Sequence, residues 1–309
     1  MKAILCTRYG SPDVLQLADI RKPTPKDHEV LIKIHATTVS AGDLRVRGFH
    51  SPLLMWIPMR LFLGLRKPRN PILGAEIAGE IESVGSRVSR FRPGDRIFAL
   101  TGLRLGGYAE YTCLPEKALI DAKPGNLGYD EAAAIPFGGT TALYFLRKGN
   151  IRKGCKALIY GASGAVGTSA VQLARHFGAE VTAACSAANF DWVRSLGADR
   201  VIDYTKDDFS HGGVRYDLVF DAVGKADKRT CKQALAPNGK YVTVDGQGIA
   251  KVKAEDLAFL RELAETGTFR PVIDRRYPLE RIAEAHRYAD TGRKRGNLVV
   301  TVARSNEND

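Results

Sequence analysis

The stretch that most constrains the fold is LIYGASGAVGTSAVQLA, residues 158–174, where a β-like apolar run passes through a Gly-rich turn into a helix-like segment. Gly161, Gly164 and Gly167 stand at this junction. There, glycines allow a tight turn, a close approach of pyrophosphate to the backbone, and close packing of helix on sheet. The helix N-terminus adds N–H groups and the positive end of its dipole. The stretch therefore predicts a dinucleotide site in a parallel-sheet domain.

Strand-like and helix-like segments alternate on both sides of this turn, which is typical of βαβ units in a doubly wound parallel sheet. Before them, short β-rich runs separated by Gly and Pro predict a barrel-like antiparallel domain. The tail reads as a strand, a helix and a strand that return to this β domain. The predicted class is α/β, with a β domain over 1–122 and 268–309 and a Rossmann-type domain over 123–267.

The end of the second strand of the Rossmann-type domain bears on the choice of coenzyme. An acidic residue there would accept a hydrogen bond from the ribose hydroxyl of NAD and repel the 2′-phosphate of NADP. The strand ends instead in AACSAAN, with Ser186 and Asn189 as small donors. This favours NADPH, while the loop's lack of Arg or Lys leaves NADH use open. Ser and Asn are also common helix caps, a role compatible with phosphate binding.

Composition narrows the class of protein and its partners. The 309 residues are 44% hydrophobic and 26% charged, which is typical of a soluble globular protein. The net charge of +12 favours anionic partners, but the bases are scattered, so no nucleic-acid partner is predicted. Five dispersed cysteines without a CxxC pair predict a reducing cytoplasm and no disulfides. No apolar run reaches the ~18 residues of a transmembrane helix, so no integral membrane segment is predicted.

Six stretches resemble the medium-chain dehydrogenase/reductase superfamily, specifically its zinc-free quinone oxidoreductase and enone reductase branch. In the order of that family, they are ILGAEIAGEIESVGSRVSRFRPGDRIFA, GGYAEYTCLPEKALIDAKP, AAAIPFGGTTALYFL, GASGAVGTSAVQLAR, SLGADRVIDY and DLVFDAVG. Together they span nearly the whole chain. The resemblance implies that the β domain is GroES-like and that the protein is a homodimer.

The resemblance also implies which residues bind the coenzyme. It places the Gly-rich turn at the pyrophosphate, Ser186 and Asn189 at the 2′-phosphate, Tyr204 at the adenosine, and Thr140 near the nicotinamide. The complete implied set is Thr140, Gly161, Ser163, Gly164, Ala165, Val166, Gly167, Ser186, Asn189, Tyr204, Val223 and Asn297. Tyr204 is equally readable as a strand-end aromatic, and Thr140 as a residue that only begins a helix.

The chain departs from its family pattern at three places. Relatives commonly carry Lys or Arg where Ala188 stands, so the 2′-phosphate should be bound more weakly. Relatives often have Asn where Ser40 stands, which leaves a hydroxyl in place of an amide to orient substrate or nicotinamide. The chain is also shorter between KYVTVDGQG and KAEDLAFL, which makes the implied dimer surface less certain.

Zinc-dependent members of the superfamily hold their metal through a Cys, a Gly-His-Glu motif, and a later Cys or Asp. In this chain, Ser40 stands at the position of the first Cys and Ala75 at that of the motif's His. Only the Glu of the motif is kept, as Glu76. One carboxylate cannot replace the three protein ligands of a catalytic zinc, so no metal is predicted. Glu76 is expected to be a hydrogen-bonded structural acid. The histidines His35, His50, His176 and His286 fit no metal spacing and are expected in packing or at the surface.

Without zinc, oxidation of a simple alcohol lacks the group that would lower the hydroxyl pKa. A quinone or conjugated enone is already electrophilic, so hydrogen-bond donors and a positioned hydride can suffice. The predicted reaction is hydride transfer from NADPH to a small hydrophobic quinone or α,β-unsaturated carbonyl. The alternatives are a non-enzymatic NADPH-binding protein of crystallin-like or regulatory type and, less favoured, a zinc-type alcohol dehydrogenase.

Three residues are candidates for catalysis. Ser40 is the leading donor to the substrate oxygen, whereas Asp43 is expected to hold its loop rather than act as an acid. Tyr108 is a weaker candidate because a Tyr in GGYAEY is as easily a core aromatic. No other acid is evident, so water is the expected source of the product's proton.

The segment SPLLMWIPMRLFLGLRKPRN, residues 51–70, is unusually apolar and ends on three bases. Pro58 and Arg60 interrupt it, so it does not read as a membrane span. In the family frame it becomes a lid over the substrate entrance, formed by Leu54, Trp56, Met59 and Phe62. A helix packed on the β domain is an equal alternative, and peripheral contact with an anionic membrane stays open.

Overall fold

The structure is a computed structural model that describes residues 1–49, 56–210 and 213–302. Its contacts divide the chain into two compact units. The first, called the β unit below, comprises Met1–Phe137 and Ile273–Asp309. The second, called the parallel-sheet unit, comprises Gly138–Val272.

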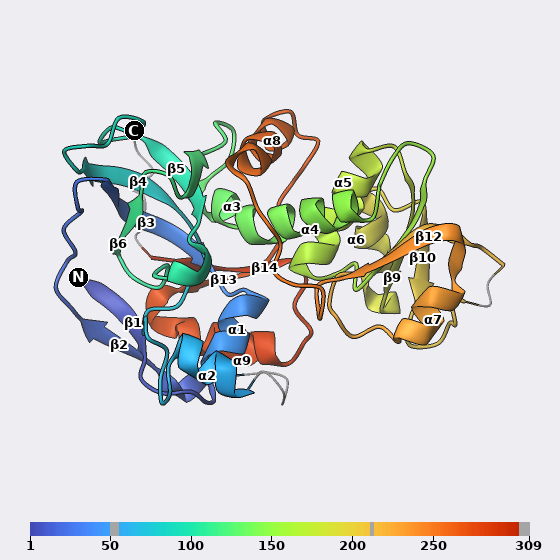
Figure 1. Cartoon of the computed structure of the whole chain (residues 1–309), viewed down its shortest axis with the longest axis horizontal. Coiled ribbons are helices and arrows are strands. Elements are labelled where there is room, and N and C mark those ends of the chain that lie inside the picture. The colour runs from blue at the N-terminus through green and yellow to red at the C-terminus, as the bar shows by residue number, and fades with distance from the viewer. Residues whose placement is uncertain (50–55, 211–212, 303–309) are drawn as a thin grey trace. The chain divides into compact units, whose positions relative to one another are not determined.

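A sheet of seven strands forms the centre of the β unit (Figure 1). Its order is β13-β14-β3-β4-β5-β7, and β6 pairs with β3 beside this path. A separate antiparallel pair is formed by β1 (Lys2–Cys6) and β2 (Leu15–Asp19). The strands of the larger sheet are β3 (Glu29–Thr38), β4 (Glu76–Val84), β5 (Arg96–Leu100), β6 (Tyr111–Pro115), β7 (Leu119–Ala122), β13 (Ile273–Pro278) and β14 (Asn297–Thr301).

Alternation of side chains along these strands builds the core of the β unit. Val30, Ile32 and Ile34 are two residues apart on β3, so they share a face, and all three are buried with Ile77 and Ile81 of β4. The C-terminal β14 pairs antiparallel with β3, with Val299 opposite Thr38. The tail of the chain therefore belongs to the β unit.

Four helices accompany this sheet: α1 (Ala41–Gly48), α2 (Trp56–Leu63), α3 (Tyr129–Ala133) and α9 (Ile282–Asp290). Helix α9 buries Ile282 and Ala285 in a core that also holds Ile4 of β1 and Leu298 of β14. Helix α2 is more apolar than α9 but buries none of its residues. The core-helix alternative is therefore wrong for residues 56–63, while Leu54 lies outside the described residues.

The parallel-sheet unit contains five parallel strands in the order β10-β9-β8-β11-β12. They are β8 (Lys156–Tyr160), β9 (Glu180–Cys185), β10 (Arg200–Asp203), β11 (Tyr216–Asp221) and β12 (Leu235–Thr243). The helices are α4 (Pro136–Lys148), α5 (Ala165–His176), α6 (Phe190–Ser195), α7 (Lys228–Gln233) and α8 (Ala254–Glu265). This arrangement confirms the predicted Rossmann-type sheet. Strand β8 lies at its centre, because β9 and β10 are added on one side of it and β11 and β12 on the other.

The division between the units falls later along the chain than the boundary predicted at residue 122. Helix α3 explains the difference, because it packs against β3 and β4 of the β unit. Its Tyr129 ring stacks on His35 with 4.2 Å between ring centroids, and its Asp130 pairs with Arg276 of β13 at 2.7 Å. These contacts join residues 129–133 to the β unit although they follow its last predicted strand.

Candidate coenzyme site and catalytic residues

The predicted coenzyme residues of the parallel-sheet unit gather at one edge of its sheet. Because β8, β9, β10 and β11 run parallel, their carboxyl ends meet at the same edge. Gly161, Ser186 and Tyr204 directly follow the first three strands, and Val223 lies two residues after the fourth. The structure thus brings together residues that are far apart in sequence, as a dinucleotide site requires.

The Gly-rich turn is crowded at Gly161 and Gly167. Gly161 has a φ of +77°, a backbone conformation that side chains disfavour. A Cβ on Gly167 would lie 2.1 Å from the carbonyl oxygen of Gly161, so helix α5 can approach the turn only without one. The Thr168 N–H donates to the Gly164 carbonyl at 2.8 Å and so closes the first turn of α5. The N–H groups of residues 165–167 precede it and are the ones that a helix start offers to an anion.

Gly164 differs from its two neighbours in this turn. It is the N-cap of α5 and contributes no capping side chain, and a Cβ there would meet only the Gly161 oxygen at 3.7 Å. Protein contacts therefore do not require glycine at 164, whereas close approach of a pyrophosphate would. Ser163 is half-buried in the same turn.

Val223 lies against the Gly-rich turn, where a Cβ on Gly161 would be 2.6 Å from its Cγ1 atom. Its loop is held by the buried carboxylate of Asp221. That carboxylate accepts hydrogen bonds from the N–H groups of Val223 at 3.1 Å, Gly224 at 2.8 Å and Ala226 at 3.0 Å. The sequence analysis missed Asp221, although an acid at the end of a buried strand was a usable signal.

The loop after β9 forms its own hydrogen-bond chain. The Asn189 amide donates to Ser186 Oγ at 2.9 Å, and the Trp192 indole donates to Asn189 Oδ1 at 3.1 Å. Neither residue makes a side-chain cap hydrogen bond at the N-cap position it occupies. The pair is therefore held in place as a unit, and the exposed Ala188 between them adds no charge.

Tyr204 and Thr140 occupy different surroundings in the parallel-sheet unit. The Tyr204 side chain is 41% exposed, and its ring centroid lies 5.2 Å from that of Tyr160. Thr140 is buried within α4. The Tyr204 placement is compatible with either of its two roles. Thr140 is the fifth residue of α4, so it does not begin that helix, and its role at the nicotinamide stays a prediction.

In the β unit, Ser40 and Asp43 begin helix α1 as a capping box. Ser40 Oγ donates to Asp43 Oδ2 at 2.6 Å and accepts from the Asp43 N–H at 3.2 Å. The same carboxylate accepts from the Ser40 N–H at 2.9 Å and from Gly74 N–H at 2.9 Å. Burial raises the pKa of Asp43, and these hydrogen bonds oppose the rise. This geometry supports the expectation that Asp43 holds its loop.

Tyr108 is fully buried, and its hydroxyl lies 3.0 Å from His286 Nε2. Burial also lowers the pKa of His286 to about 3. Tyr108 thus has a structural partner, one that no local sequence signal indicated. Asn297, expected at the coenzyme, is buried at the start of β14 and donates to the Ala134 carbonyl at 3.2 Å.

The residues at the superfamily's zinc positions do not fit a metal. Ser40 engages Asp43, Ala75 has no donor atom, and Glu76 accepts from Thr38 Oγ1 and from the Phe137 N–H at 2.6 Å. Burial raises the pKa of Glu76 to about 7. In the described part of the chain, no three His, Cys, Asp or Glu side chains are grouped as metal ligands.

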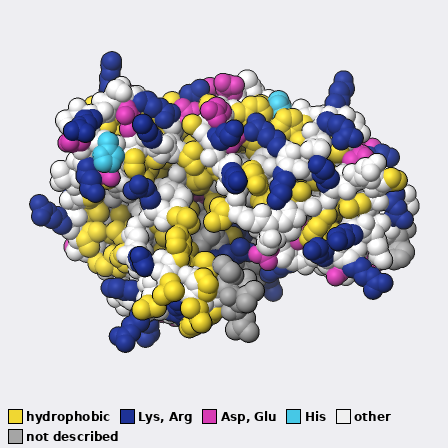
Figure 2. All heavy atoms as spheres, viewed as in Figure 1, with side chains coloured by type: hydrophobic (Ala, Val, Ile, Leu, Met, Phe, Trp, Pro, Cys, Tyr) yellow, Lys and Arg dark blue, Asp and Glu magenta, His cyan; other side chains and the backbone are white. Residues whose placement is uncertain are grey.

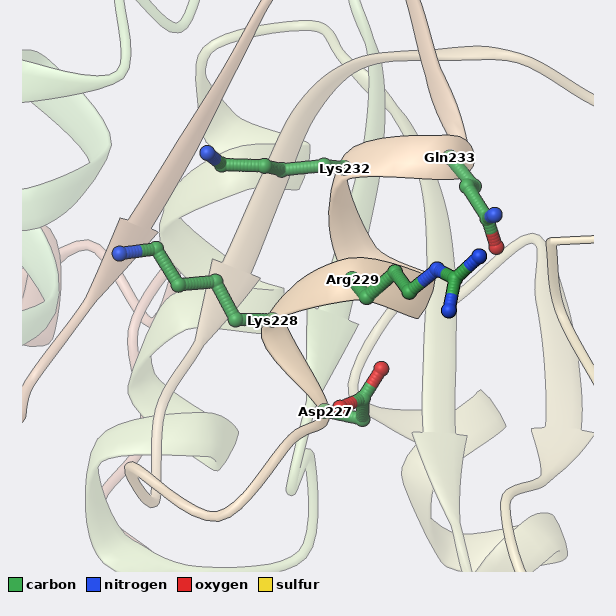
Figure 3. A pocket seen from close by; sticks show the side chains of 5 residues that line it. All are labelled: Asp227, Lys228, Arg229, Lys232 and Gln233. Atoms are coloured by element: carbon green, nitrogen blue, oxygen red, sulfur yellow. The ribbon is translucent and has the colours of Figure 1, made fainter.

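A hollow of about 690 Å³ lies beside α7 (Figure 3). It is far from the Gly-rich turn along the sequence, and its lining residues include none from that turn. In Figure 3, Lys228 and Lys232 extend to one side of the helix, while Arg229 and Gln233 lie close together on the other. Asp227 caps this helix by accepting from the Thr230 N–H at 2.7 Å. The hollow contains none of the predicted coenzyme residues and is not assigned to that site.

The two units and the coenzyme turn define a two-domain, dinucleotide-dependent oxidoreductase. Residues 26–124 match the family described as the alcohol dehydrogenase GroES-like domain, and residues 165–284 match the family described as zinc-binding dehydrogenase. The chain belongs to the medium-chain dehydrogenase/reductase superfamily, in its quinone oxidoreductase-like branch.

Individual relatives agree with this placement. The chain is 34% identical to 2-methylene-furan-3-one reductase of Solanum lycopersicum, over 97% of this chain and 79% of the relative. It is 33% identical to the chloroplastic NADPH-dependent alkenal/one oxidoreductase of Arabidopsis thaliana, with the same coverage. The solved quinone oxidoreductase of Coxiella burnetii superposes with a TM-score of 0.84 at 28% identity, covering 98% of this chain and 99% of that one.

Proposed function

We propose that the chain is an NADPH-dependent reductase that transfers hydride to a quinone or to the β-carbon of an α,β-unsaturated carbonyl. The observation that carries this proposal is the turn at residues 161–167, whose crowded glycines leave backbone N–H groups for a pyrophosphate while the zinc positions lack ligands. The similarity to alkenal/one and quinone oxidoreductases supports the same acceptor class.

Different groups of the chain bind different parts of the coenzyme. The N–H groups at the start of α5 bind the pyrophosphate, and Ser186 and Asn189 bind the 2′-phosphate. When bound, NADPH supplies the hydride. A quinone or enone needs no metal to accept it, because the product charge is spread over a conjugated oxygen that a hydrogen-bond donor can stabilise.

Ser40 is the proposed donor to the substrate oxygen. Its hydroxyl donates to Asp43 Oδ2 in this structure, so donation to a substrate requires the hydroxyl to turn away from that oxygen. After this rotation, the Asp43 carboxylate would still accept hydrogen bonds from the N–H groups of Ser40 and Gly74. These bonds lower the free-energy cost of losing the Ser40 hydroxyl as a donor. Tyr108 interacts with this carboxylate from the core and lowers its pKa, so we assign Tyr108 a supporting role and not that of the donor. Water supplies the final proton.

Steady-state oxidation of NADPH tests the proposal with a panel of quinones, short enals and long-chain enones, each compared with NADH. Turnover that depends on the acceptor is the expected result. Coenzyme binding without turnover on any acceptor would favour the alternative of a non-enzymatic NADPH-binding protein, and stoichiometric zinc in the purified protein would revive a zinc-type alcohol dehydrogenase.

Two further properties are part of the proposal. All five cysteines are free thiols, which fits a reducing compartment such as the cytoplasm. The homodimer implied by the resemblance is measurable by light scattering after size-exclusion chromatography. No helix in the described residues is long and apolar enough to cross a membrane.

A further inference from the structure

Helix α2 and the turn after it present large apolar side chains to solvent. Five of them form what is called the apolar face below, and their side chains are 44 to 67% exposed: Trp56, Ile57, Leu61, Phe62 and Leu65. Figure 2 shows hydrophobic side chains gathered where Figure 1 places α2, with Lys and Arg side chains around them. Single exposed apolar residues are ordinary, but five within ten positions mark an interaction surface.

This face is held in a fixed conformation by its inner side. The Arg60 guanidinium lies over the rings of Tyr9, Phe49 and Trp56, at 4.6, 4.0 and 4.8 Å from their centroids, and also donates to the Leu65 carbonyl. Such stacked, hydrogen-bonded arginines order the groups around them.

Two further hydrogen bonds fix the end of α2 and the turn that follows. Tyr9 Oη donates to the Gly64 carbonyl at 2.9 Å, and Arg69 Nη2 donates to the Leu61 carbonyl at 2.7 Å. Gly64 has a φ of +124°, and a Cβ there would lie 2.1 Å from the Lys67 oxygen, so the turn is tight. The apolar face thus belongs to an ordered helix and turn and not to a frayed chain end.

The charged residues that directly follow the apolar face along the sequence are all basic. Arg66, Lys67 and Arg69 follow it directly and are exposed, and the sequence has no Asp or Glu between Asp43 and Glu76. Arg47 is neutralised by Asp290 and Arg60 faces the aromatic rings, so the three bases after α2 supply the outward charge. A surface of apolar side chains bordered by exposed bases matches the acyl boundary and anionic headgroups of a lipid bilayer.

We propose that the apolar face and its three bordering bases dock the protein peripherally on a membrane that contains anionic phospholipid. Trp56 and Phe62 are of the side-chain types that settle at the interfacial depth of a bilayer. Two-fold pairing with a second copy through this face would bring Arg66 and Lys67 against the same bases, which opposes that occupant. The proposal goes beyond the reductase activity and does not depend on it.

Co-sedimentation of the full chain with phosphatidylcholine vesicles, prepared with and without phosphatidylglycerol, tests the proposal. Binding should require the anionic lipid and should fall at high salt, because the Debye length shrinks to about 3 Å at 1 M. Leu61→Ser with Phe62→Ser should weaken binding at least about tenfold. Arg66→Ser with Lys67→Ser should weaken it about 25-fold, at roughly fivefold per base.

Matched controls lie in the parallel-sheet unit. Ile249 is 76% exposed and Arg152 and Lys153 are adjacent exposed bases, so Ile249→Ser and the double change Arg152→Ser with Lys153→Ser should leave vesicle binding unchanged. Circular dichroism spectra and thermal midpoints of all variants check that each one is folded.

Three outcomes would overturn the proposal. The first is wild-type protein that binds no vesicle, or binds neutral and anionic vesicles alike. The second is a dimer that Leu61→Ser with Phe62→Ser dissociates while vesicle binding is absent. The third is a rise in KM for bulky acceptors in that variant without vesicle binding, which would favour the lid alternative.

Discussion

Tyr108 Oη and His286 Nε2 lie 3.0 Å apart inside the β unit, joining a residue of the GGYAEY segment to one of helix α9. Both side chains are fully buried, and their rings meet edge to face. His286 must therefore fold in its neutral form, and the nearby Arg47 charge further disfavours protonation. A buried neutral histidine links the stability of the β unit to pH.

The change His286→Gln should make the protein less sensitive to mild acid. The pKa of His286 falls from an ordinary 6.5 to about 3 on folding, so between these values the unfolded chain binds a proton that the folded chain excludes. Its contribution to stability is complete above pH 6.5 and is lost as pH falls. At pH 5 the loss is ~2 kcal/mol, and glutamine, whose amide can donate to or accept from Tyr108 but does not titrate, should not show it.

Urea unfolding of both proteins at pH 7 and pH 5 measures this difference. Glu76 titrates in the same range with the opposite sign, because its raised pKa makes the folded chain the better proton binder. The Glu76 contribution is the same in both proteins. It therefore cancels when the change in unfolding free energy between pH 7 and pH 5 is compared between wild type and His286→Gln. Equal losses of unfolding free energy in wild type and His286→Gln would contradict the prediction.

Ser40→Ala should lower kcat with quinones and enones by about 100-fold if its hydroxyl stabilises the product anion. The variant also loses the capping contacts with Asp43, which costs about 1 kcal/mol of stability. Ser40→Asn is the rescue control: because asparagine caps helices well and restores a donor, it should recover both the thermal midpoint and kcat. Turnover unchanged in Ser40→Ala would remove Ser40 from catalysis, whereas a lower thermal midpoint alone would reveal a structural role.

Much of the fold could be predicted because its signals are local. The Gly-rich junction at 161–167 and the alternation of strands with helices depend on residues close in sequence, and both were interpreted correctly. The boundary near residue 122 was placed too early in comparison with the structure's division, because α3 belongs to the β unit through long-range contacts such as that of Tyr129 with His35.

The candidate site was predictable to a smaller extent for the same physical reason. Ser186, Tyr204 and Val223 could be placed because each lies at or close after a strand end and such ends meet in a parallel sheet. The pairing of Tyr108 with His286 spans most of the chain and has no periodic signature. Similarly, the apolar pattern at 56–63 fits a buried and an exposed helix equally, so only tertiary packing could decide.

Gly167→Ala should destabilise the protein, whereas Gly164→Ala should weaken coenzyme binding alone. A Cβ on Gly167 would lie 2.1 Å from the Gly161 oxygen, which should cost about 3 kcal/mol or prevent folding. A Cβ on Gly164 meets protein only at 3.7 Å and would instead obstruct a pyrophosphate. Thermal unfolding and NADPH titration by fluorescence check the pair, and a tenfold weaker Kd with an unchanged midpoint is expected for Gly164→Ala.

Ala188→Arg should strengthen the preference for NADPH over NADH. Ala188 is exposed between Ser186 and Asn189, whose side chains are already held by hydrogen bonds, so a guanidinium there adds charge without disturbing the loop. A charge-assisted hydrogen bond to the 2′-phosphate should lower the KM for NADPH about tenfold, and the KM for NADH should stay the same because its adenosine ribose carries a hydroxyl and no phosphate at the 2′ position. Ala188→Gln, of similar reach but uncharged, is the matched control and should change both values little. An equal fall in both KM values for Ala188→Arg would show that residue 188 contacts the coenzyme elsewhere than at its 2′ position.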